Sequence, residues 1–155
     1  MATITCTSVL PIAAEDLWRA VHDPQTLVRV VAPLLELKPL EPKIFPDEFA
    51  PATYVVSVKA FGVLPLGRQA INISHPAPEP GETLPRYVLH DKGSGDLAHI
   101  WDHRITIEPL SKTACRLSDV VEVEAGVLTP FVALLARILF RHRHARLAAL
   151  TKVTR

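Results

Sequence analysis

The chain has 155 residues, of which 48% are hydrophobic and 21% charged, and its formal net charge is +1. A chain of this length and composition favours one globular domain over residues 1–155, with a core large enough to need no disulfide or metal. The balanced charge gives no electrostatic reason to expect a nucleic-acid partner.

The N-terminal residues carry neither a basic region nor a continuous apolar core, so we expect no signal peptide. The longest apolar run, residues 127–140, is interrupted by polar residues and falls short of the roughly 20 residues that cross a bilayer. Cys6 and Cys115 have neither metal nor disulfide spacing, and we expect both to be small buried side chains in a reducing compartment. These features predict a cytoplasmic protein without stable membrane insertion.

Strand-like alternation and helical periods follow one another along the chain. In chain order they predict a strand at 2–9, a helix at 12–22, a second short helix from 23 to near 33, strands at 34–40 and 53–61, an apolar turn at 61–67, strands at 68–74 and 86–92, a turn at 93–95, strands at 99–108 and 114–124, and a helix at 129–153. Strands at short spacing favour hairpins, because parallel pairs need long crossovers. We therefore predict an α+β helix-grip fold, in which a curved antiparallel sheet of about seven strands wraps the terminal helix.

The last two predicted strands carry polar side chains on their apolar faces. One face of the first holds His99, Trp101, His103, Ile105 and Ile107, and one face of the second holds Cys115, Leu117, Asp119, Val121 and Val123. Polar groups on an inward face cost stability unless they are paired, so this face favours a cavity over a solid core.

The register of this hairpin decides which polar side chains meet. If Ile107 lies opposite Cys115, then His103 lies opposite Asp119, within hydrogen-bonding reach. A slip by two residues keeps the same faces inside and places Asp119 opposite Trp101 or Ile105, with His103 diagonal to it.

The order of elements and several segments resemble the START/polyketide-cyclase superfamily of ligand-binding proteins (SRPBCC, birch-pollen-allergen-like). The segments that carry the resemblance are 12–24, which ends in Asp-Pro, 99–108, 117–124, 126–130 and 140–147. The resemblance implies a seven-stranded sheet wrapped on the last helix, with an apolar cavity between them. It names no ligand, since the relatives include lipid carriers, hormone-binding proteins, aromatases and cyclases.

We predict that this cavity binds a small hydrophobic molecule, for transport or sequestration, with His103 and Asp119 as a polar anchor. The residues expected to line it are Tyr54, Val56, Val58, Gln69, Ile71, Tyr87, Leu89, Trp101, His103, Asp119, Phe131, Leu135, Ile138 and His142.

Two alternatives remain open. His103 and Asp119 could form the acid–base pair of a cofactor-independent cyclase, dehydratase or hydrolase, although their face carries no nucleophile. The chain could instead be a protein-interaction module that uses the apolar tip 61–67. The same tip could gate the cavity or contact a second subunit in a homodimer.

We expect no metal and no cofactor. His99 and His103 would lie about 13 Å apart along one strand, and His142 and His144 would project about 200° apart on the helix. No phosphate loop or dinucleotide fingerprint is present. The basic segment 141–146 is interpreted as the solvated end of the helix, with His144 on the side away from the core.

Overall fold

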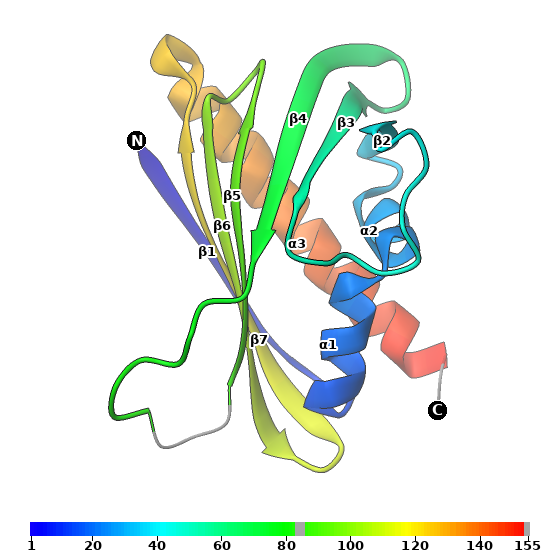
Figure 1. Cartoon of the computed structure of the whole chain (residues 1–155), viewed down its shortest axis with the longest axis vertical. Coiled ribbons are helices and arrows are strands. Elements are labelled where there is room, and N and C mark those ends of the chain that lie inside the picture. The colour runs from blue at the N-terminus through cyan, green and yellow to red at the C-terminus, as the bar shows by residue number, and fades with distance from the viewer. Residues whose placement is uncertain (83–85, 154–155) are drawn as a thin grey trace.

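The computed structural model describes residues 1–82 and 86–153. Its elements are β1 (Ala2–Leu10), α1 (Ala14–His22), α2 (Pro24–Val31), β2 (Leu35–Glu41), β3 (Thr53–Ala60), β4 (Leu64–Ser74), β5 (Tyr87–Gly95), β6 (Ile100–Ser111), β7 (Ala114–Glu124), the 3-10 turn η1 (Gly126–Leu128) and α3 (Thr129–Val153). The strands form one antiparallel sheet in the order β1-β7-β6-β5-β4-β3-β2, and α3 crosses one face of it (Figure 1). The predicted helix-grip fold is confirmed.

Side-chain hydrogen bonds are found where α2 and α3 begin. The Asp23 carboxylate accepts a hydrogen bond from the backbone N–H of Gln25 at 2.8 Å, and Pro24 fills the first position of α2. At the start of α3, the Thr129 hydroxyl accepts from the N–H of Ala125 and donates to the carbonyl of Gly126. These contacts begin the helices where the sequence predicted them.

One face of α3 packs on the sheet, and another face borders the cavity. The helix packs against β1, β7 and α2, and its buried apolar residues are Val132, Ala136, Phe140 and Leu147. Phe131, Leu135 and Ile138, which we predicted to line the cavity, are exposed because they border it and do not pack on the sheet.

Two predicted turns are shorter than expected or absent. The apolar turn at 61–67 is confined to the residues before Leu64, where β4 begins, and Phe61 and Gly62 have positive φ. Gly93 and Gly95 belong to β5 and do not form a turn. A Cβ at Gly95 would lie 2.3 Å from Oε1 of Gln69 and 2.7 Å from the carbonyl oxygen of Arg68. These contacts leave no space for a side chain where β4 approaches β5.

The register of β6 on β7 places Asp119 opposite Ile105 and Val121 opposite His103. Our first register, with His103 opposite Asp119, is therefore wrong, and the slipped alternative is correct. The strands continue to Ser111 and Ala114, so a tight turn and an adjacent bulge fix the pairing.

Candidate functional site

A cavity of about 520 Å³ lies between α2, α3 and the sheet. Its described lining is mostly aliphatic and aromatic, and the polar exceptions are Thr26, Arg68, Gln69, Asp91, His103 and Arg143. This volume falls in the range of small-molecule sites, which are apolar with a few converging polar groups.

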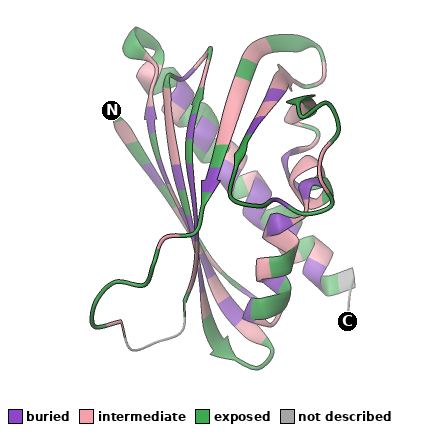
Figure 2. Ribbon diagram, viewed as in Figure 1, coloured by how far each residue is buried: buried purple, intermediate pink, exposed green. Residues whose placement is uncertain are grey.

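The cavity opens between the β3–β4 hairpin and the N-terminal half of α3. The lining side chains that are also exposed and apolar are Phe61, Leu64, Phe131, Leu135 and Ile138. The turn between β3 and β4 consists of exposed and half-buried residues (Figure 2). The apolar tip noticed in the sequence thus forms one side of the cavity mouth.

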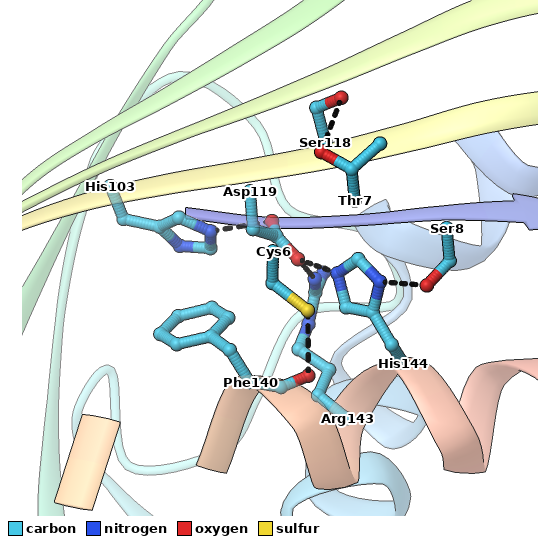
Figure 3. Close-up of polar contacts among 9 residues, drawn as sticks. All are labelled: Cys6, Thr7, Ser8, His103, Ser118, Asp119, Phe140, Arg143 and His144. Carbon is cyan, nitrogen blue, oxygen red and sulfur yellow. Dashed lines mark hydrogen bonds and ion pairs between the residues drawn. The ribbon is translucent and has the colours of Figure 1, made fainter. Parts of the chain in front are cut away.

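Asp119 lies at the centre of a buried polar cluster behind the cavity wall. Its Oδ1 lies 2.7 Å from Nε2 of His103, and its Oδ2 lies 2.7 Å from Nε2 of His144 and also pairs with Nη1 of Arg143. Nδ1 of His144 lies 2.7 Å from the hydroxyl of Ser8. Figure 3 shows the carboxylate between the His103 ring and the two α3 side chains, so the cluster joins β1, β6, β7 and α3.

The cluster keeps Asp119 ionised although its side chain is fully buried. Burial alone would raise the pKa of Asp119, but the Arg143 guanidinium and the contacts with His103 and His144 outweigh it and hold the pKa well below its usual range. An ionised carboxylate only accepts hydrogen bonds, so Nε2 of each histidine carries a proton and donates it.

This assignment fixes what His103 presents to the cavity. With the proton on Nε2, the neutral imidazole has a free lone pair on Nδ1. Among the described residues, no hydrogen-bond partner reaches Nδ1 of His103, and the ring belongs to the cavity wall. His103 is therefore positioned by Asp119 through Nε2, and its neutral form would present Nδ1 as an acceptor at the cavity wall.

A second carboxylate, Asp91 on β5, lies directly opposite His103 of β6. Its Oδ1 accepts a hydrogen bond from the N–H of Asn72 at 2.7 Å, and its side chain also lines the cavity. Burial raises the pKa of Asp91 to about 6, although His103 and the Asn72 N–H partly oppose this. The cavity therefore has a carboxyl group that changes charge close to neutral pH.

Most of the predicted lining residues do border the cavity, namely Val56, Val58, Gln69, Ile71, Leu89, Trp101, His103, Phe131, Leu135 and Ile138. Four others lie elsewhere, which corrects our expectation. Asp119 stands behind His103, and the Tyr54 hydroxyl donates to the carbonyl of Ala50. Tyr87 packs against Trp18 of α1, and Nε2 of His142 contacts the carbonyl of Ala32.

Comparison with known proteins agrees with this architecture. A family model described as a domain of unknown function, DUF8410, matches residues 8–151. The chain belongs to the DUF8410 family. No curated protein matches it.

Solved structures place the DUF8410 chain in the START/SRPBCC fold. A protein from Chromobacterium violaceum is 25% identical over 97% of both chains, with a TM-score of 0.66. A START superfamily protein from Mycobacterium smegmatis is 17% identical over 99% of both chains, with a TM-score of 0.65. An AHSA1 protein from Silicibacter pomeroyi is 14% identical, covers 99% of this chain and 100% of its own, and has a TM-score of 0.61.

The sequence patterns missed three polar residues of the DUF8410 site. Arg143 and His144 are buried, so the interpretation of segment 141–146 as a solvated helix end is wrong for these two. Asp91 is two residues after Leu89, which we predicted to line the cavity, so strand alternation would have placed it on the same inward face. The sequence feature that could have indicated a buried Arg143 is Asp119, because a carboxylate on an inward strand face needs a cation as its partner.

Other sequence-predicted residues of the DUF8410 chain lie apart from the cavity. His99 precedes β6 and borders a separate recess beside Val55. Cys115 is buried and Cys6 is half-buried, and both are free thiols. Within the described ranges, no group of three or more histidine, cysteine or acidic residues is arranged to hold a metal. No helix in that part of the chain is long and apolar enough to span a membrane.

Proposed function

We propose that this chain is a single START-like domain that binds a small hydrophobic molecule between the sheet and α3, for transport or sequestration. The observation that carries the proposal is the cavity of about 520 Å³ with an almost wholly apolar wall. Apolar ligand surface transferred from water to such a wall gains about 25 cal/mol per Å².

The distribution of polar groups supports a ligand with one polar end. Gln69, Asp91 and His103 come from the neighbouring strands β4, β5 and β6 and all line the cavity. The apolar mouth at Phe61 and Phe131 would admit the rest of the ligand. The polar groups would orient the molecule, and the apolar wall would provide most of its affinity.

Filling the cavity is expected to abolish binding. Val58 lines the cavity from β3, and Val58→Trp would place an indole in the space that the ligand needs. We expect the affinity for the neutral fluorescent probe N-phenyl-1-naphthylamine to fall at least tenfold, measured by fluorescence titration. The matched control is Val55→Trp, on the same strand but outside the cavity lining, which should leave binding unchanged.

Two results would contradict this proposal. The first is a natural protein that shows no saturable binding of the probe. The second is a Val58→Trp variant that binds the probe as well as Val55→Trp does. Solvent extraction of the denatured protein, followed by mass spectrometry, would also identify any hydrophobic molecule that co-purifies with it.

A second function, general acid–base catalysis, is favoured by one arrangement. Asp119 holds His103 with the unprotonated nitrogen toward the cavity, as a general base requires. On this proposal, incubation of the protein with a molecule extracted from it would convert that molecule, and His103→Gln would slow conversion at least 100-fold. Chromatography of the incubated mixture measures this, and full activity of His103→Gln would rule the role out.

A further inference from the structure

We propose that the cavity selects ligands whose polar end donates hydrogen bonds, such as an alcohol or an amine, and rejects those that end in a carboxylate. This inference rests on the proposed hydrophobic-ligand function and adds the chemistry of the head group. The residues that carry it are Asp91, His103 and Gln69, which lie on adjacent strands.

Asp91 provides the first acceptor. Its side chain is buried, with the residue only 7% exposed, and its Oδ1 is occupied by the backbone N–H of Asn72. No described residue reaches Oδ2 within hydrogen-bonding distance, and no fully buried polar atom of the described residues lacks a partner. The second oxygen therefore faces the cavity, where a ligand group would be its partner.

His103 adds an acceptor directly beside Asp91, whereas Gln69, paired with Gly95, adds one about 13 Å farther along β5. His103 donates through Nε2 to Asp119, so its neutral form would present the Nδ1 lone pair as an acceptor in the cavity wall. Gln69 donates through Nε2 to the carbonyl of Ala70 at 3.3 Å, and its Oε1 lies against Gly95, where no side chain intervenes. Asp91 and His103 are directly opposed, so their Cβ atoms lie about 4.5–5.5 Å apart. One hydroxyl or amino group can reach both.

The cations of the lining do not reverse this preference. Arg143 lines the cavity, and its charge is paired with the buried carboxylate of Asp119. Arg68 lies at the exposed edge with Asp96 at 3.8 Å. A carboxylate ligand would bring a second negative charge next to Asp91 in a poorly hydrated space, where like charges repel strongly. A hydroxyl would instead donate to the Asp91 carboxylate or to His103.

The experiment is a competition for bound N-phenyl-1-naphthylamine at pH 8, with decan-1-ol and decanoate as competitors of equal chain length. We expect decan-1-ol to displace the probe at a concentration at least tenfold lower than decanoate, after correction for the affinity of each variant for the probe. Part of this difference arises in any apolar cavity. The decisive measurement is therefore the ratio of the decanoate concentration to the decan-1-ol concentration that displaces the probe from Asp91→Asn. This isosteric variant removes the charge, and the ratio should fall at least threefold through stronger decanoate binding.

The matched control is Asp102→Asn, which removes a carboxylate on the other face of the sheet, hydrogen-bonded to His90. Its competition ratio should equal that of the natural protein. An unchanged ratio in Asp91→Asn, or decanoate competing as well as decan-1-ol in the natural protein, would overturn the inference while leaving hydrophobic binding intact. Failure of the probe itself to bind would instead overturn the proposed function. If Asp91→Asn does not fold, the same competition is measured in Asp91→Ser, which also removes the charge.

Discussion

Replacement of Asp119 by asparagine is expected to lower the free energy of unfolding by about 3–5 kcal/mol, because it leaves a buried cation without its partner. Arg143 is only 7% exposed, and Asp119 is its ion-pair partner. The new amide would also direct N–H groups toward the donors of Arg143 or His144. Urea unfolding at pH 7, followed by circular dichroism, measures the loss.

Asp102→Asn is the control for this first prediction. Asp102 also pairs with a histidine, His90, but it lies on the opposite face and its side chain is 33% exposed. We expect that variant to lose no more than about 1 kcal/mol. Equal losses in the two variants would contradict a structural role for the Asp119 cluster.

Replacement of Asp91 by asparagine is expected to stabilise the protein at pH 8, by up to about 3 kcal/mol. Burial raises the pKa of Asp91 from its ordinary 3.8 to about 6, so the folded state favours the neutral carboxyl group. The stability that this provides is complete below pH 3.8 and is lost as the pH rises through about 6. Asparagine stays neutral, and its carbonyl oxygen can still accept from the Asn72 N–H.

Urea unfolding of both proteins between pH 4 and pH 8 tests this second prediction. The difference in unfolding free energy should be close to zero at pH 4 and should grow toward pH 8. The charges that act on Asp91 are His103, His90 and Asp102, and both proteins keep all three. A variant that is equally stable or less stable than the natural protein at pH 8 would show that the Asp91 charge costs nothing.

The order of elements was predictable because strand and helix periods change clearly along this chain. The inward position of His103 and Asp119 followed from strand alternation alone. The register of their strands did not, because a two-residue slip leaves every side chain on the same face. Only the length of β6 and β7, which end at a tight turn after Ser111, settles the register.

The residues that α3 contributes to the site could not be predicted, for a different reason. In the sequence Arg141-His-Arg-His-Ala-Arg146, the basic residues give no indication of which side faces the core. Arg143 is buried because Asp119, on β7, supplies the opposite charge. A buried cation of this kind can be recognised only when its partner in space is known.

The side-chain partners of Asp119 lie on β6 and α3, and His144 of α3 also contacts Ser8 of β1. Among the described residues, this cluster includes no side chain of β2, β3 or β4. The cavity lies between α3 and the hairpin of β3 and β4, both of which contribute lining residues. The hydrogen bonds of the buried carboxylate therefore hold α3 against β6 and β7 and do not reach the β3–β4 hairpin. The ion pair with Arg143 thus ties the terminal helix to one half of the sheet, and the cavity lies between that helix and the other half.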